Sequence, residues 1–235
     1  MIAKGIGLTD IHTHILPGMD DGSASAEETL ALLSSLSAQG VTTVAATPHF
    51  YAERDNPTDF FRRRQEAMET VKGLELPDIR VLPGAEVLFY PGISRTEMLP
   101  EFAIGETGLL LVEMPFCSWN DSEVGEVVSI GRTRGLQVVL AHIDRYLTRK
   151  NTGYLTELMQ NDVLFQVNAD AFLDRRKKKA ALGLFADGLV RFVGSDCHNM
   201  TSRPPKLSDA YRVISDEFGK GAIAWLADQS AMFFE

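Results

Sequence analysis

Short apolar segments alternate with amphipathic segments along the chain, and this alternation constrains the fold more than any other feature. It occurs about seven times: an apolar, β-branched segment ends in polar residues, and a segment with helical periodicity follows. Strands that alternate with helices form a parallel sheet through right-handed crossovers. Because the chain has 235 residues and 45% hydrophobic content, we expect a single domain over residues 1–235.

The expected elements follow from hydrophobic runs and from helix start and stop residues. We expect a first strand over Ile6 to His12 and a helix that begins at Ser25, with Glu28 completing a capping box, and stops at Gly40. Further strands are expected at "VTTVAAT", "RVLPGAE", "GLLLVEMP", "LQVVLAH", "VLFQVNA" and "LVRFVGSD". Helices are expected near residues 58–72, 122–134 and 177–185, after residue 152, and at the C-terminus.

The positions of the ionisable residues favour a barrel over an open sheet. No glycine-rich phosphate loop follows the first strand, which disfavours an open nucleotide-binding sheet. Eight ionisable residues, including all five histidines, lie at or just beyond the carboxyl ends of predicted strands: His12, His14, His49, Glu86, Glu113, His142, Asp196 and His198. In a barrel those ends converge on one face, where active sites lie.

This set of residues indicates a metal site. A lone histidine is more often a hydrogen-bonded polar residue than a ligand, but the same coincidence for all five histidines is much harder to accept. In "HTH" the imidazoles of His12 and His14 share one side of an extended strand, and "DCH" repeats that spacing with a carboxylate and an imidazole. Imidazole and carboxylate ligands suit manganese, iron or zinc, so we expect an open catalytic centre.

Charge and cysteine content exclude several classes of protein. A net charge of -9 would repel nucleic acid and anionic membranes, so we expect neither as a partner. The two cysteines provide no disulfide framework, and no charged-then-apolar leader follows Met1. No apolar run is long enough to cross a bilayer. We therefore expect a cytoplasmic location, while the oligomeric state stays open.

Taken together, the motifs resemble those of the PHP (polymerase and histidinol phosphatase) metallohydrolases. The similarity is greatest to the bacterial manganese-dependent tyrosine phosphatases of capsule and exopolysaccharide operons. It rests on "DIHTHILPGMDDG", "TPH", "GAE", "LVEMP", "AHIDRY", "QVN" and "SDCHN" followed by "RPP", which occur in the family's order along nearly the whole chain. The resemblance implies a distorted (β/α)7 TIM-like barrel.

The resemblance also implies site residues and cofactors. By motif, nine ligands would hold two or three divalent ions, most often Mn²⁺ with iron or zinc as alternatives: His12, His14, Asp21, His49, Glu86, Glu113, His142, Asp196 and His198. Spacing alone does not distinguish Asp20 from Asp21. Arg145 and Arg203 correspond to phosphate-binding arginines. The family commonly has Pro-Glu before the first arginine, whereas this chain has Ile143 and Asp144.

The function implied is hydrolysis of phosphotyrosine by a metal-activated hydroxide, with a bacterial tyrosine kinase of capsule or exopolysaccharide synthesis as the protein partner. The group that gives a proton to the departing phenol oxygen could be Asp144, Asp196 or solvent. One alternative is a small-molecule phosphatase of the histidinol-phosphatase type. Another is a metal-dependent phosphoprotein-binding module without turnover, which would be expected to have a broken ligand set.

Four further features have two interpretations each. "CHNMTSR" satisfies C-x5-R of cysteine phosphatases, but it contains no glycine between Cys197 and the arginine and an acid precedes the cysteine, so we disfavour a thiolate mechanism. Asn168 would cap a helix or bind within the site, and we favour the cap. The run "RRKKK" would be a solvated helix face or an acidic-peptide site, and we favour the former. Four aromatic residues near the strand ends, Phe50, Tyr51, Phe116 and Trp119, would stack on a phosphotyrosine ring or pack at the rim.

Overall fold

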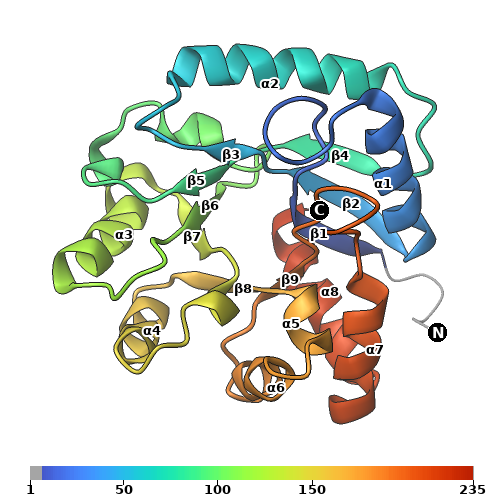
Figure 1. Cartoon of the computed structure of the whole chain (residues 1–235). Coiled ribbons are helices and arrows are strands. Elements are labelled where there is room, and N and C mark those ends of the chain that lie inside the picture. The colour runs from blue at the N-terminus through green and yellow to red at the C-terminus, as the bar shows by residue number, and fades with distance from the viewer. Residues whose placement is uncertain (1–6, 235) are drawn as a thin grey trace.

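The computed structural model describes residues 7–234, and Figure 1 shows a curled parallel sheet with helices around its outside. The strands are β1 (Leu8–Thr13), β2 (Val41–Ala46), β3 (His49–Phe50), β4 (Arg80–Pro83), β5 (Glu86–Leu88), β6 (Leu109–Glu113), β7 (Gln137–Leu140), β8 (Leu164–Asn168) and β9 (Phe192–Gly194). The helices are α1 (Ala26–Ala38), α2 (Pro57–Lys72), α3 (Asp121–Arg134), α4 (Asn151–Gln160), α5 (Ala169–Leu173), α6 (Lys178–Ala186), α7 (Leu207–Phe218) and α8 (Gly221–Phe234). The expected strand start at Ile6 lies outside the described residues.

These strands occupy seven positions around a ring. The sheets have the orders β1-β2-β4 and β3-β5-β6-β7-β8-β9, and β3 and β5 continue β2 and β4 after short breaks. The first break contains Pro48, which has no N–H to donate to the ladder. The ring closes where the His14 N–H donates to the Cys197 carbonyl and the Asp196 N–H donates to the His12 carbonyl, both at 2.9 Å. The distorted seven-stranded barrel is therefore confirmed.

The predicted helices are confirmed to within a few residues, with one change in capping. The Ser25 side chain accepts from the Glu28 N–H at 3.3 Å and starts α1. The Glu28 carboxylate accepts from the Ala24 N–H instead of the Ser25 N–H, so the reciprocal bond of the box is displaced by one residue. Gly40, with φ 89°, follows the end of α1. The short helix α5 was not predicted.

Apolar side chains alternate between two core layers, as expected for a barrel. Leu109 and Leu111 of β6 lie in an inner cluster with Ile11 and Val139, while Leu110 and Val112 belong to the layer between the strands and the helices. The C-terminal Phe234 joins the inner cluster, and Phe233 packs against it. The last helix therefore packs on the barrel of its own chain.

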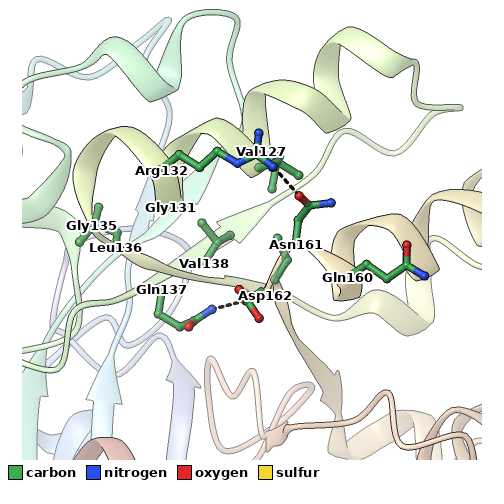
Figure 2. A pocket seen from close by; sticks show the side chains of 12 residues that line it. Val127, Gly131, Arg132, Gly135, Leu136, Gln137, Val138, Gln160, Asn161 and Asp162 are labelled. Atoms are coloured by element: carbon green, nitrogen blue, oxygen red, sulfur yellow. Dashed lines mark hydrogen bonds between the residues drawn. The ribbon is translucent and has the colours of Figure 1, made fainter.

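A polar hollow lies at the amino ends of β7 and β8, at the opposite ends of these strands from the predicted metal ligands (Figure 2). Its lining includes Arg132, Gln137, Asn161 and Asp162. The Arg132 guanidinium donates to the Asn161 side chain at 2.7 Å, and the Gln137 amide donates to the Asp162 carbonyl. None of the helices in the part of the chain that the structure describes is long and apolar enough to cross a membrane.

Candidate metal centre

The two histidines of "HTH" project from β1 into the mouth of the barrel. Their side chains share one face of the strand, with His12 Nε2 3.2 Å from His14 Nε2. The intervening Thr13 donates its hydroxyl to the Ala45 carbonyl of β2 at 2.7 Å. Both imidazoles are fully buried, so the strand presents two nitrogen ligands side by side in a site shielded from water.

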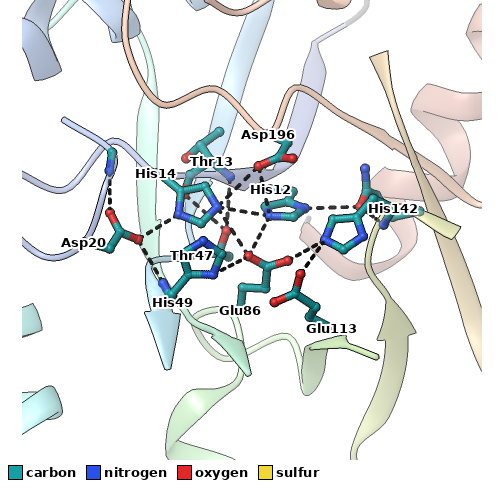
Figure 3. A network of polar contacts seen from close by, with 12 residues as sticks. His12, Thr13, His14, Asp20, Thr47, His49, Glu86, Glu113, His142 and Asp196 are labelled. Carbon is teal, nitrogen blue, oxygen red and sulfur yellow. Dashed lines mark hydrogen bonds and ion pairs between the residues drawn. The ribbon is translucent and has the colours of Figure 1, made fainter. Parts of the chain in front are cut away.

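Glu86 lies at the centre of the histidines (Figure 3). Its Oε2 lies 2.9 Å from His49 Nδ1, 3.3 Å from His12 Nε2 and 3.4 Å from His14 Nε2. Its Oε1 lies 2.8 Å from His142 Nε2. Burial opposes ionisation of Glu86, but the charge of His12 and the hydrogen bonds from the histidines outweigh it and hold the pKa well below its ordinary range.

The remaining predicted ligands lie around this centre. Asp21 Oδ1 is 3.4 Å from His198 Nε2 and 3.5 Å from His49 Nε2. Glu113 Oε1 is 3.5 Å from His142 Nε2. The structure thus brings all nine predicted ligands into one cluster, within which three groups of donor atoms have metal-binding spacing: His14, Asp21, His49 and His198; His12, His14 and Asp196; and His49, Glu86 and Glu113.

The donor atoms of this cluster fit divalent cations. His49 Nδ1, Glu86 Oε2 and His198 Nε2 are buried without a hydrogen-bond partner, although Glu86 Oε2 lies close to the imidazole nitrogens. Close polar atoms without hydrogen-bond geometry are what a set of ligands directed at shared ions would show. Burial and the neighbouring Glu86 raise the pKa of Glu113 to about 7, a repulsion between carboxylates that a cation would relieve.

Asp20 and Asp21 differ in their contacts. The Asp20 carboxylate pairs with His14 Nδ1 at 2.7 Å and accepts from the His49 N–H at 2.9 Å, whereas Asp21 lies within a donor group. A carboxylate on the far nitrogen of an imidazole fixes which nitrogen is free for a metal. Asp20 therefore orients His14.

Gln166 of β8 is a supporting residue that the sequence reasoning missed. Its Oε1 lies 3.1 Å from His12 Nδ1 and accepts from the His142 N–H at 2.7 Å. Its amide donates to Asn168 Oδ1 at 2.8 Å. Gly194 leaves room for this side chain, because a Cβ there would lie 2.8 Å from Gln166 Nε2. The sequence feature that could have identified Gln166 is its position as a polar residue in an otherwise apolar strand. It lies two positions before Asn168 and so on the same face of the strand.

Asn168 binds within the site, so the favoured prediction that it caps a helix was wrong. Its side chain makes no capping bond to α5. It donates instead to Asp196 Oδ2 at 2.8 Å. Gln166 and Asn168 thus form a hydrogen-bonded chain from His12 to Asp196.

Two arginines border the cluster at its partly exposed edge. Arg145 Nη2 lies 2.5 Å from Asp196 Oδ2, and Arg203 Nη2 lies 2.8 Å from Asp196 Oδ1. Arg145 belongs to a short 3-10 helix, η3 (Ile143–Arg145), which follows His142 in a left-handed conformation with φ 34°. The two guanidiniums converge on one carboxylate from different loops, an arrangement that could also hold a phosphate.

Of the four aromatic residues, two are buried in the core and two lie beside the histidine cluster. Phe50 and Trp119 are fully buried in the core, so of the two interpretations left open for them, stacking on a phosphotyrosine ring is excluded. Tyr51 stacks on His49 with ring centroids 5.1 Å apart. Phe116 is 64% exposed and lies parallel to the His142 ring at 6.0 Å, with the Arg145 guanidinium 5.9 Å from its centroid.

Cys197 is placed unsuitably for a nucleophile. It is completely buried, and burial together with the neighbouring Asp10 raises the pKa of its thiol well above the ordinary range. A reactive thiolate needs the opposite environment, with a lowered pKa and access to the substrate. The structure therefore agrees with the prediction against a cysteine mechanism.

Asp144 is a buried carboxylate that pairs with the exposed Lys177 at the edge of the site. Its Oδ1 accepts from the Asn168 N–H at 3.1 Å, and its Oδ2 lies 3.1 Å from Lys177 Nζ. The Asp144 side chain is 2% exposed. Asp144 therefore links η3 to the end of β8 and to the basic run at the start of α6.

Known relatives match this chain over most of its length. A tyrosine-protein phosphatase CpsB from Streptococcus agalactiae serotype III (strain NEM316) is 28% identical over 225 residues, covering 91% of this chain and 92% of that protein. The tyrosine-protein phosphatase YwqE from Bacillus subtilis (strain 168) is 28% identical over 224 residues, covering 90% and 85%.

A solved structure shares the fold closely. It comes from work on YwqE from Bacillus subtilis and CpsB from Streptococcus pneumoniae, described as unique metal-dependent tyrosine phosphatases. It superposes with a TM-score of 0.84 at 25% identity, covering 96% of this chain and 94% of the other. The family model for capsular polysaccharide synthesis, CpsB/CapC, matches residues 8–232. The chain therefore belongs to the CpsB/CapC family.

Proposed function

We propose that this protein is a metal-dependent phosphatase that hydrolyses phosphotyrosine in proteins. The observation that carries the proposal is the cluster of five histidines and four carboxylates with two arginines at its edge. The names of its relatives, tyrosine-protein phosphatases CpsB and YwqE, support the same activity.

The nine clustered side chains are the proposed metal ligands. They would hold two or three divalent ions, and their mixture of imidazoles and carboxylates suits Mn²⁺, with iron and zinc as alternatives. When bound, such ions supply a water activated for attack and positive charge that offsets the charge of the phosphate. Asp20 and Gln166 would hold His14 and His12 in the tautomers that direct Nε2 into the cluster.

Arg145 and Arg203 would bind the non-bridging phosphate oxygens. Both guanidiniums contact Asp196, and both are partly exposed, at 27% and 36%. The planar fork of arginine can donate two parallel hydrogen bonds to a phosphate. A phosphate that enters the site would therefore share these donors with Asp196.

Phe116 and Tyr51 would contact the ring of the phosphotyrosine. Phe116 exposes a large apolar side chain beside Arg145, and Tyr51 lies over His49 on another side of the cluster. Aromatic rings pack well against a tyrosyl ring and offer less to the short aliphatic chain of phosphoserine. These two residues would favour aryl phosphates.

The leaving group would take its proton from solvent. Of the two carboxylates that the sequence offered as acids, Asp196 already accepts from two arginines and Asn168. Asp144 is held by Lys177 and the Asn168 N–H. A phenolic oxygen with a solution pKa of about 10 leaves more readily than an alkoxide, which reduces the need for a dedicated acid.

We also propose a protein partner, a cellular location and a domain organisation for this chain. A bacterial tyrosine kinase that regulates capsule or exopolysaccharide synthesis is the proposed phosphoprotein, since the family model concerns capsular polysaccharide synthesis. We propose a cytoplasmic location, which two free cysteines support. Residues 1–235 would form a single catalytic domain.

A substrate panel tests the activity. The metal-free protein is loaded with manganese and assayed on a phosphotyrosine peptide, a phosphoserine peptide of the same sequence, and histidinol phosphate. We expect the highest kcat/KM on phosphotyrosine and loss of turnover with a chelator. Preference for histidinol phosphate would replace the proposal with a small-molecule phosphatase. Tight binding of the phosphotyrosine peptide without phosphate release would replace it with a binding module.

A further inference from the structure

The basic run Arg175–Lys179 precedes and begins α6, and all five of its residues are exposed. Only Lys177 of this run pairs with a carboxylate within residues 7–234, through its contact with Asp144. The other four cations have no such partner, although the chain as a whole is strongly acidic, with net charge -9. The run is therefore a local positive surface on an acidic protein.

Three of these cations, Arg175, Lys178 and Lys179, border a hollow of about 500 Å³ between α6 and the end of α7. Leu182 of α6 and Phe218 of α7 provide apolar surface in the hollow, and Phe218 is 38% exposed. Glu217 is the one acidic residue of the lining. The hollow thus combines a predominantly cationic edge with apolar contacts.

The stability of α6 does not explain these charges. Lys178 and Lys179 occupy the first turn of the helix, which contains no acidic residue, and the preceding Lys177 makes no capping bond. The helix dipole disfavours cations at this end of the helix. A binding role accounts for positive charge at a position where the fold itself gains nothing from it.

Lys177 connects this surface to the metal centre. It contacts Asp144, whose neighbour Arg145 contacts Asp196 in the cluster. Asp144 also accepts from the backbone N–H of Asn168 at the end of β8. The basic run therefore starts at the edge of the site and continues along α6, away from it.

We propose that this hollow binds an acidic segment of the phosphoprotein that flanks the phosphotyrosine. The proposal rests on the proposed phosphotyrosine phosphatase activity and adds a sequence preference to it. Lysine and arginine at the edge would attract aspartate and glutamate side chains, while Leu182 and Phe218 would contact apolar residues of the same segment. A peptide fits this site better than an anionic membrane, because the surface is concave and the rest of the protein is acidic.

The test uses the full-length manganese enzyme and a triple charge reversal, Arg175→Glu with Lys178→Glu and Lys179→Glu. Its substrates are a phosphotyrosine peptide with acidic flanks, one with uncharged flanks, and a small aryl phosphate. We expect kcat/KM on the acidic peptide to fall roughly tenfold, mainly through KM, because long-range attraction is replaced by repulsion. The other two substrates should change less than about twofold.

The matched control reverses the same number of charges elsewhere, at Lys72, Arg95 and Arg132, which lie on α2, η1 (Ile93–Arg95) and α3. It should leave the preference for the acidic peptide intact. Equal losses on all three substrates, or the same selective loss in the control, would overturn the docking proposal. So would cosedimentation with anionic phospholipid vesicles that depends on the three α6-side cations without any peptide preference. Failure of the wild-type enzyme on the small aryl phosphate would instead overturn the phosphatase proposal.

Discussion

The two ends of the barrel are both concave and polar, but they differ in whether their buried polar atoms have hydrogen-bond partners. At the amino ends of β7 and β8, Arg132 and Gln137 find partners in Asn161 and the Asp162 carbonyl. None of the residues that line this hollow has a buried polar side-chain atom without a partner, in the described part of the chain. At the carboxyl ends, Glu86 and three histidines, His49, His142 and His198, each have such an atom.

Buried polar atoms without partners indicate the position of the functional site better than a concave shape does. A buried polar atom without a hydrogen bond destabilises the folded protein by about 1–3 kcal/mol, so several in one place require a compensating ligand. The amino end needs none, because its groups satisfy one another or reach solvent. The following changes test the contrast, beginning with the largest expected effect.

Glu86→Gln should give the largest loss. The carboxylate contacts four histidines, and an amide there supplies weaker metal coordination and no charge. We expect at least one fewer bound metal ion per chain by elemental analysis and no measurable turnover of a phosphotyrosine peptide. Wild-type metal content together with wild-type activity would contradict the central place of Glu86 in the site.

Arg145→Gln should reduce turnover without removing metal. Loss of one donor to the transferring phosphate lowers kcat/KM by roughly 100- to 1,000-fold. Arg145→Lys is the matched variant, and it should recover only part of the activity because lysine cannot bind two oxygens in a planar fork. A fall in manganese content equal to the fall in activity would instead indicate that the arginine only supports Asp196.

Gln166→Leu should weaken metal binding to an intermediate extent. The substitution removes the acceptor of His12 Nδ1 and of the His142 N–H. Loss of such an orienting partner lowers metal affinity or activity by roughly 10- to 100-fold. Titration calorimetry with manganese measures the affinity, and Gln166→Glu, which keeps an acceptor oxygen, should retain more of it. Unchanged affinity in the leucine variant would show that the barrel alone orients His12.

Cys197→Ala should have a small effect on activity and a modest effect on stability. Removing a fully buried sulfur is expected to destabilise the fold by about 1 kcal/mol, measured by denaturant unfolding. The kcat/KM should stay within about twofold of wild type. Complete inactivation of a folded, manganese-loaded variant would revive the cysteine mechanism.

Arg132→Ala at the amino end should have the smallest effect. Its guanidinium contacts Asn161 at the surface, so stability should change by no more than about 0.5 kcal/mol. Metal content and kcat/KM should equal those of wild type. A loss of activity comparable to that of Gln166→Leu would contradict the conclusion that only the carboxyl end of the barrel carries the function.

Most of the fold could be predicted because its signals are local. The strand–helix alternation located the strand positions, and capping residues such as Ser25 and stop residues such as Gly40 located the helix ends. The breaks that divide two strands were missed, because the pattern of apolar residues continues across Pro48 while the hydrogen-bond ladder does not. Helix α5 was missed because five residues are too few to show a helical period.

The site was predictable in its residue types and only partly in their roles. Histidines at strand ends are visible in the chain, and a barrel brings such ends together. Whether an aromatic residue faces the site or the core is not a local property: Phe50 is buried, while its neighbour Tyr51 stacks on His49. Asn168 likewise occupies a helix-capping position in the sequence, but in the structure its side chain donates a hydrogen bond to Asp196.

By itself, the sequence determined that the chain forms a parallel barrel with its histidines at one end, since periodicity and strand ends are properties of neighbouring residues. Family motifs were needed to choose Asp21 over Asp20. Only the tertiary structure decided that Gln166 supports His12, a residue 154 positions away, and that the basic run at the start of α6 connects to the site through Asp144. Contacts between distant segments depend on how the closed barrel aligns its strands, which no local pattern records.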